Sequence, residues 1–591
     1  MSIFKFVEEH LIGEVRGVDT SRVFIQVNSS ERLSHARVGR LVAVQGRDAN
    51  EWLVGMINRV WRDPIDSDDE IEAEVEPSLV ENNGVQVTLV GTYRVKHGEM
   101  ENYFTRAVLS LPDINRPVFP IEEKALEDFM SIIGSIGLKG STRPLEIGTY
   151  TLDRKAKAYI DGDKLFQRHA ALLGSTGSGK SWSVANILEQ AASLDFSNVV
   201  VFDLHGEYTQ LPYPQQLRVA GPGDIANPEN NVLFLPFWLL NYDEMQTMLI
   251  DRTEQSAPNQ SLAVLEAINK AKRDSLTKLD KQDVLGTFTV DSPIPFEMKL
   301  IIEELDKKNT ENIGTGEVYR SGEKKGEEKT TQGPLYNKLT RLLIRLQNKI
   351  DDRRYGFLFQ PPKSWYKYEA LHLLAEKLMG HKGVKDYKQS GVKVIDFSEV
   401  PSDVLPIMVS LVARLIFQIQ FWSNPGQDND GRHPILLVCD EAHLYLPSSD
   451  KSTNPLESKA LQNFERIAKE GRKYGVGLLV VSQRPSDVSS TILSQCNNLI
   501  SLRLSNDRDK SVVKGLMPDS LSGLLDILPG LEIGEAIVVG DAVLLPTRII
   551  LNKPTHKPRS ATINFWQCWL EQKGSTNLIQ AVENLRKQSR S

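Results

Sequence analysis

The sequence predicts an α/β protein built on a largely parallel sheet, with a small β-barrel before it and a helical insertion within it. Three observations support this fold class. Short strand patterns separated by Gly, Asn and Asp clusters occupy residues 11 to about 120, which is typical of a barrel. Buried strand patterns alternate with helical patterns from about residue 145, which favours a parallel sheet. Helical periodicity dominates residues 240 to about 390.

The barrel is predicted for residues 1–120. An acidic tract at 66–76 interrupts it and is interpreted as a solvated loop. The expected strands are Gly13–Arg16, Val23–Val27, Arg40–Val44, Glu51–Ile57 and Val85–Val90.

The sheet domain is predicted in two parts, 121–239 and 391–555, followed by a helical tail at 556–591. A helix at 120–140 leads into it, and the two late strand patterns suggest a hairpin. The expected strands are Leu145–Tyr150, Ala170–Leu173, Asn198–Asp203, Val392–Asp396, Ile435–Cys439, Val476–Ser482 and Leu499–Leu504, then Glu535–Val539 and Ala542–Leu545. The expected helices are Trp182–Ala192, Val404–Trp422, Ile563–Glu571 and Leu578–Arg586.

The helical insertion is predicted for residues 240–390. Leu262–Ile268 and Leu339–Ile350 show its periodicity. Within the insertion, residues 306–333 are polar and rich in Gly, Lys and Glu. Because such a composition buries little apolar surface, we expect a mobile charged loop there.

Composition narrows the class of protein. The chain has 591 residues, 40% hydrophobic and 25% charged, as in ordinary soluble proteins. A formal net charge of −7 argues against bulk coating of nucleic acid, although a local basic surface is compatible with it. The three cysteines lack metal-ligand spacing, and no apolar run approaches the length of a membrane span. We therefore expect a cytoplasmic protein without membrane partners.

Residues 174–181 read Gly-Ser-Thr-Gly-Ser-Gly-Lys-Ser and match the phosphate-binding P-loop pattern G-x-x-x-x-G-K-[ST]. A buried strand pattern precedes the loop and a helical pattern follows it, which is the required context. The glycines let backbone N–H groups point at phosphate oxygens. Lys180 would reach the β- and γ-phosphates, and Ser181 would ligate Mg²⁺. The expected nucleotide-contacting residues are Gly174, Ser175, Thr176, Gly177, Ser178, Gly179, Lys180, Ser181 and Trp182.

Two carboxylates follow the buried strand pattern Ile435–Cys439. Parallel sheets place ligands at the carboxyl ends of their strands. There Asp440 would hold Mg²⁺, and Glu441 would polarise the attacking water. The P-loop and this acidic pair together predict an ATPase.

Two other nucleotide-binding patterns occur in the sequence, but their positions do not suit the protein families that use them. Asp203–Gly206 and Asn348–Asp351 match GTPase motifs, but the second lies in an amphipathic helical run instead of after a strand. A GTPase would also leave Asp440 and Glu441 without a role. Leu521–Leu524 resembles part of the ABC-transporter signature but follows the acidic strand instead of preceding it.

The chain resembles the HerA branch of the HerA–FtsK superfamily, and the similarity covers the barrel and the whole ATPase domain. Gly534–Gly540 matches a closing strand of that family. The motifs that carry the resemblance are Arg168–Ser181, Asp203–Tyr208, Asp440–His443, Glu470–Gly475 and Ser482–Pro485, in that order.

The resemblance implies a RecA-like ATPase core and a homo-hexameric ring that translocates double-stranded DNA through its pore. It further implies that the barrel docks an effector, often a nuclease. Bacterial proteins of this kind also resemble the ATPase half of two-gene antiphage systems, whose effector is a defence enzyme. ATP and Mg²⁺ are the implied cofactors.

The resemblance also assigns roles to single residues. Gln483 would sense the γ-phosphate from the end of the strand beside the acidic strand. Asp203 and Glu207 would lie near the metal and the attacking water; alternatively, they cap the helix that follows their strand. His205 and His443 lack a third ligand at metal spacing, so we expect structural roles and no zinc.

Basic residues carry the expected contacts between subunits and with DNA. Arg168 would contact phosphates or a neighbouring subunit. Arg472 is the expected arginine finger, with Arg466 as the alternative, although Arg472 also suits a solvated helix end. Lys451 and Lys459 lie in a loop after the acidic strand, where they would contact DNA phosphates or only solvent.

Two functions fit these motifs. One is a DNA-translocating ATPase. The other is a nucleotide-gated hexameric scaffold that assembles and activates a partner enzyme. DNA-stimulated ATP turnover would support the first, and partner activation that survives loss of hydrolysis would support the second.

Overall fold

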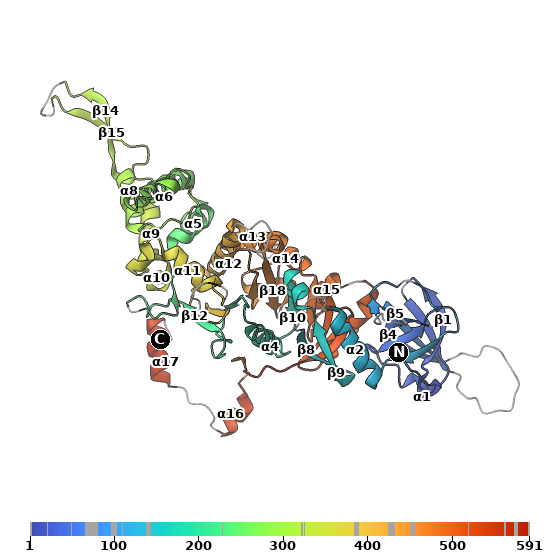
Figure 1. Cartoon of the computed structure of the whole chain (residues 1–591). Helices are drawn as coiled ribbons and strands as arrows, with labels where there is room; N and C mark the ends of the chain where they lie inside the picture. The colour runs from blue at the N-terminus through green and yellow to red at the C-terminus, as the bar shows by residue number, and fades with distance from the viewer. Residues whose placement is uncertain are drawn as a thin grey trace, which may run out of the picture. The chain divides into compact units, whose positions relative to one another are not determined.

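The computed structural model describes residues 3–588 with gaps, in two compact units (Figure 1). The first unit comprises residues 1–194, 438–443 and 475–560, and the second comprises 195–437, 444–474 and 561–591. Within that span, the description leaves out 21, 49, 65–80, 96–102, 109, 138–143, 227, 321–322, 324, 383, 385–388, 424–431, 449–454, 518, 561–562 and 572–576.

Six antiparallel strands of the first unit close into a barrel, which confirms the prediction (Figure 1). Their order is β2-β1-β7-β3-β4-β5, and β5 also pairs with β2, which joins the two ends of the sheet. Alternate side chains fill the interior, as Val23, Ile25 and Val27 of β2 do. The acidic tract 66–76 lies outside the described residues. The elements are β1 (Gly13–Asp19), β2 (Arg22–Val27), α1 (Ser30–Leu33), β3 (Leu41–Gln45), β4 (Glu51–Pro64), β5 (Glu81–Arg94), β6 (Tyr103–Thr105) and β7 (Pro117–Pro120).

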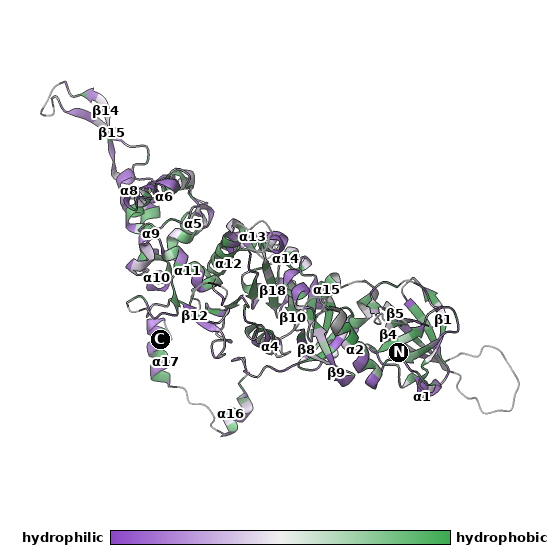
Figure 2. Cartoon of the chain, viewed as in Figure 1, coloured by the Kyte–Doolittle hydropathy of each residue, from purple (hydrophilic) through white to green (hydrophobic). Residues whose placement is uncertain are grey.

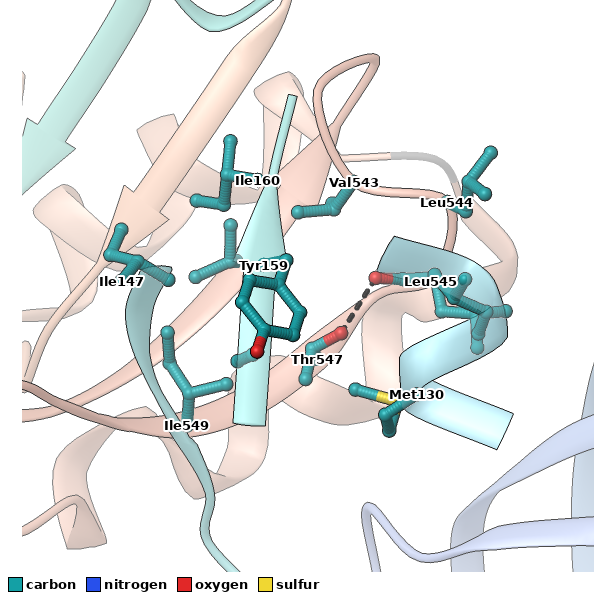
Figure 3. A pocket seen from close by; sticks show the side chains of 12 residues that line it. Met130, Ile147, Tyr159, Ile160, Val543, Leu544, Leu545, Thr547 and Ile549 are labelled. Carbon is teal, nitrogen blue, oxygen red and sulfur yellow. Dashed lines mark hydrogen bonds between the residues drawn. The ribbon is translucent and has the colours of Figure 1, made fainter. Parts of the chain in front are cut away.

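Helix α2 (Glu123–Gly137) packs on β9 (Asp153–Ile160), which forms a hairpin with β8 (Leu145–Tyr150). Figure 3 shows the apolar pocket under this helix, lined by Ile147, Leu545 and other aliphatic side chains. Its volume of about 20 Å³ holds no more than about one water. Sequence reasoning missed β9 because exposed Lys and Arg side chains alternate with its small buried residues.

The sheet of the first unit runs β17-β18-β10-β19-β20-β21-β8-β9. β10 is parallel to both β18 and β19, and the strands from β20 onward are antiparallel. β17 has its first three residues in the second unit. The remaining elements are α3 (Gly162–Gln167), β10 (Ala170–Leu173), α4 (Lys180–Ala192), β17 (Ile435–Cys439), β18 (Val476–Ser482), α14 (Ser490–Ser494), β19 (Asn498–Ser501), α15 (Asp507–Leu516), β20 (Glu535–Gly540) and β21 (Thr547–Leu551).

The late hairpin is present, but its second strand was predicted in the wrong place. β20 pairs with β21 at Thr547–Leu551, whereas Ala542–Leu545 forms a turn. The turn's main chain bonds to side chains and to the Asp161 N–H instead of to a strand. The Arg106 guanidinium donates to one of its carbonyls at 3.1 Å, and Asn498 Oδ1 accepts from one of its N–H groups at 2.8 Å.

The second unit combines four parallel strands with the helices of the predicted insertion. The strand order is β13-β12-β16-β11. The strands are β11 (Val199–Asp203), β12 (Gln215–Val219), β13 (Val232–Leu233) and β16 (Val392–Asp396). The helices are α5 (Tyr242–Leu249), α6 (Ala257–Lys278), α7 (Gln282–Leu285), α8 (Met298–Thr310), α9 (Thr340–Asp351), α10 (Gly356–Phe359), α11 (Ala370–Met379), α12 (Leu405–Trp422) and α13 (Pro455–Glu470).

A buried ion pair ties three of these helices together. Arg414 of α12 donates to the carboxylate of Glu244 in α5 at 2.7 and 2.8 Å. Asn463 of α13 donates to the same carboxylate at 3.1 Å. Because a buried charge without a partner is costly, this network fixes the insertion against the sheet's own helices.

The charged segment 306–333, expected as a mobile loop, contains regular secondary structure among its described residues, and its mobility stays a prediction. α8 continues to Thr310, and β14 (Asn312–Val318) pairs antiparallel with β15 (Glu328–Gln332). Figure 1 shows this ribbon projecting beyond α6 and α8. Composition correctly predicts that β14 buries no side chain. The backbone pairs nevertheless, and cross-strand ion pairs such as Lys329–Glu317 at 3.0 Å support it.

Helix α12 contradicts the expectation that no apolar run approaches the length of a membrane span. Its 18 residues are long and apolar enough by length and composition alone (Figure 2), and 72% of them are buried inside the structure. Core helices of soluble proteins pass the same test.

The predicted tail helices are present as α16 (Phe565–Glu571) and α17 (Leu578–Lys587). Their apolar side chains are exposed, among them Trp566 and Ile579.

Candidate active site

The P-loop joins β10 to α4 in the conformation that its glycines allow. Gly177 and Gly179 have φ values of +74° and +110°, which favour glycine. A Cβ at Gly174 would lie 2.6 Å from Ser178 Oγ. That Oγ is buried without a hydrogen-bond partner among the residues that the structure describes. The loop thus holds an unsatisfied polar group at its centre, as a site for a polar ligand does.

Lys180 begins α4 and is buried within the loop. Its Nζ donates to the carbonyl of Ser175 at 3.3 Å. A buried ammonium that faces a loop of backbone N–H groups favours a polyanion, and the residues present therefore fit a nucleotide triphosphate.

Gln483 lies where the resemblance predicts. It directly follows β18, the strand between β10 and β17. Its Oε1 accepts a hydrogen bond from Thr176 Oγ1 in the P-loop. The side chain is therefore placed to respond to what the loop binds.

Asp440 and Glu441 directly follow β17. Asp440 is buried, and its Oδ1 accepts from the Glu441 N–H at 2.9 Å. Glu441 has a φ of +45°, a conformation that side chains rarely adopt and that clusters at functional sites. Its Oε2 lies 3.3 Å from His443 Nδ1, so the histidine that we expected to be structural directly contacts the predicted general base. The only sequence signal for this contact is its position two residues after Glu441.

Asp203, in the second unit, accepts hydrogen bonds from the backbone of the loop that follows it. It is fully buried at the end of β11. Its Oδ1 accepts from the N–H groups of His205 and Glu207, at 3.3 and 3.0 Å, and its Oδ2 accepts from Tyr208 N–H at 2.9 Å. The described residues 204–211 form no helix, so Asp203 caps a turn instead of the helix start that we considered as the alternative.

Two features distinguish the chemistry of this loop. Burial raises the pKa of Asp203 to about 6, the charge of Asp396 adds to this rise, and the backbone N–H groups oppose it. Glu207 keeps a buried Oε2 without a hydrogen-bond partner among the described residues. Of the two acids, Glu207 is the one whose carboxylate is available to a ligand.

Arg168 lies at the end of β10 opposite the P-loop. Its guanidinium pairs with Asp541 in the turn after β20, and Arg106 of the barrel lies 3.7 Å from the same carboxylate. A contact from Arg168 to phosphates of its own subunit therefore has no support in this arrangement. The contact to a neighbouring subunit stays a prediction.

The candidate residues for subunit contacts and for DNA contacts differ in their surroundings. Arg472 is exposed and makes no ion pair with any residue that the structure describes. Arg466 pairs with Glu470 at 3.3 Å and lies over the ring of Phe417. Lys459 pairs with an aspartate of α5 at 2.7 Å. Lys451 lies outside the described residues.

Comparison with known proteins agrees with these motifs. Residues 145–416 match the family model described as the central domain of helicase HerA. A probable helicase of Methanocaldococcus jannaschii is 26% identical over 80% of this chain and 78% of its own length. The DNA double-strand break repair helicase HerA of Saccharolobus solfataricus is 27% identical over 83% of each chain. The HerA of Sulfolobus acidocaldarius is 28% identical over 68% of each.

Solved structures resemble the chain only distantly. VirB4 of Thermoanaerobacter pseudethanolicus is 17% identical, with 70% of this chain and 97% of that chain covered and a TM-score of 0.41. The conjugative coupling protein TrwB is 14% identical, with 73% and 93% covered and a TM-score of 0.43.

Proposed function

Because the chain is a HerA-type ATPase of the HerA–FtsK superfamily, we propose that it is a ring-forming motor that translocates double-stranded DNA with the energy of ATP hydrolysis. The observation that carries the proposal is the order of three neighbouring strands, β17-β18-β10. The acidic pair follows β17, Gln483 follows β18, and the P-loop follows β10. The Thr176–Gln483 hydrogen bond joins two of these three parts directly.

The site supports hydrolysis with ATP and Mg²⁺. Ser181 and Asp440 supply a hydroxyl and a carboxylate, the oxygen ligands that Mg²⁺ prefers, and Lys180 would bind the phosphates. When bound, the ion neutralises charge that develops on the phosphates. Glu441 would orient the attacking water and accept its proton, with the His443 imidazole beside the carboxylate. Glu207 would support the water, with Asp203 as a positioning residue.

We propose further that the ring is a homo-hexamer in which Arg472 acts on the neighbouring subunit's nucleotide. Phosphoryl transfer spreads negative charge over the γ-phosphate oxygens, and an arginine that stabilises it changes the rate by roughly 10³–10⁵-fold. Arg472 is exposed and unpaired among the described residues, whereas Arg466 already has a carboxylate and an aromatic partner.

Mixing two inactive variants tests this assignment. Arg472→Ala and Lys180→Ala should each be nearly inactive alone. Mixed rings would contain interfaces that join an intact P-loop to an intact arginine, so part of the ATPase activity should return. Subunit exchange without any returning activity would contradict the assignment.

The barrel is the proposed docking surface for a partner nuclease or another defence effector. It is a closed unit of strands that carries none of the ATPase motifs. A pull-down with the product of the neighbouring gene, using intact and barrel-deleted rings of equal size, tests this role. Equal capture by both forms would contradict it.

A scaffold that activates its partner is the second candidate, because it would use the same site. ATP turnover distinguishes the two. A motor should hydrolyse ATP faster with double-stranded DNA, and Lys180→Ala should abolish both hydrolysis and partner function. Partner function that survives in Glu441→Gln rings would favour the scaffold.

A further inference from the structure

The helix that follows the P-loop carries a tryptophan that a distant segment partly covers. Trp182 lies two residues after Lys180 in the first turn of α4 and is half-buried. The segment Asn552–Pro558, here called the strap, follows β21. Its first residue donates its N–H to the carbonyl of Ile147 at 2.9 Å, which fixes where the strap begins.

Three contacts place the strap along α4. Glu189 accepts the N–H of Thr555 at 2.7 Å and contacts His556 Nδ1 at 3.1 Å. Lys557 Nζ lies over the Trp182 ring, 5.9 Å from its centroid. Glu189 and Trp182 are seven residues apart, so they share one face of the helix. The strap therefore runs toward the phosphate loop and ends with a cation above an aromatic face.

We propose that Trp182 and Lys557 form the base subsite, in which the purine base of a nucleoside triphosphate stacks on the indole ring beneath the lysine. The inference rests on the proposed function, which places the phosphates in the adjacent loop. A base stacked between the indole ring and the lysine ammonium would lie about 3.5 Å from each, so the ring and the ammonium must be about 7 Å apart. Lys557 Nζ lies 5.9 Å from the Trp182 ring centroid, about 1 Å less than this separation. The exposed lysine stem can move to provide the missing distance.

The chemistry of these groups defines the ligand. An aromatic face attracts flat rings and cations, and stacking on it tolerates different bases because every base has a π-face. The larger purine ring covers more of the indole than a pyrimidine does. We therefore expect ATP and GTP to bind with similar affinity and CTP to bind more weakly.

Inorganic tripolyphosphate has phosphates but no base, so comparing its binding affinity with that of ATP tests the contribution of the base. Titration calorimetry is done in the Glu441→Gln background, so that ATP is not consumed. Trp182→Ala should weaken ATP roughly five- to hundredfold and leave tripolyphosphate unchanged, while Trp182→Phe should keep most of the affinity. Lys557→Met, at an exposed position, should weaken ATP about threefold. Trp422→Ala, which removes an exposed tryptophan of α12, is the matched control and should change neither ligand.

Two results would overturn the base subsite. In one, Trp182→Ala weakens ATP and tripolyphosphate equally, so that the ring only supports the loop. In the other, neither Trp182→Ala nor Lys557→Met changes ATP binding. Failure of the proposed function looks different: the parent protein would bind neither ligand, or would bind both regardless of Lys180→Ala.

Discussion

Two acidic strand ends in this protein occupy equivalent places and have different roles. Asp440 and Glu441 directly follow β17, and Asp203 is the last residue of β11, each at the carboxyl end of a buried strand. At the first end, Glu441 has a φ of +45° and its Oε2 lies 3.3 Å from His443 Nδ1. At the second, Asp203 uses both oxygens on its own backbone.

The difference shows how the surroundings of a carboxylate decide its role. Asp203 is surrounded by N–H groups, so it organises a turn and leaves Glu207 to face a ligand. The Glu441 carboxylate instead lies beside an imidazole, with Oε2 3.3 Å from His443 Nδ1, and its proposed role is to orient water. A carboxylate whose two oxygens both accept from its own loop, as in Asp203, is therefore better suited to positioning that loop than to proton transfer.

The largest expected effect is on Glu441. Glu441→Gln should keep ATP binding and lower turnover roughly 10²–10⁴-fold, because only proton acceptance is lost. Steady-state hydrolysis and nucleotide affinity, measured on the same rings, check this. Near-normal turnover would assign the role of general base to Glu207 instead of Glu441.

A smaller effect is expected at Glu207. Glu207→Gln should lower turnover about tenfold without lowering the melting temperature, since it removes charge but fills the same space. Asp203→Ala should lower both, because it leaves buried N–H groups without acceptors at about 1–3 kcal/mol each. Hydrolysis and thermal unfolding separate the two variants. Equal loss of stability in both would show that Glu207 is structural too.

A third expected effect is a pH dependence of stability. The folded pKa of Asp203 is raised from 3.8 to about 6, so its contribution to stability is present below about pH 4 and is lost as pH rises through 6. Asp203→Asn cannot ionise. Its unfolding free energy relative to the parent should therefore rise by up to about 3 kcal/mol between pH 4 and pH 7, above a constant offset from altered hydrogen bonds. A difference that does not change with pH would show that Asp203 is not desolvated.

The sequence by itself determined the parts that rest on neighbouring residues. The P-loop, the acidic pair and the alternating barrel strands are each encoded within a few positions, because local backbone geometry and side-chain period need only short spacings. The same holds for the helices of the insertion, whose periodicity the structure confirms.

Only the tertiary structure decided which of these residues serve each other. Arg168 meets Asp541, and Lys557 meets Trp182, each across more than 370 positions of chain. Ala542–Leu545 has an apolar pattern that suits a strand, yet side chains from the barrel and from β19 take its backbone groups. Asp203 looks like any strand-end acid until its burial and its three N–H donors are known. Period and propensity describe one segment at a time, whereas hydrogen-bond partners and burial depend on every segment that packs around it.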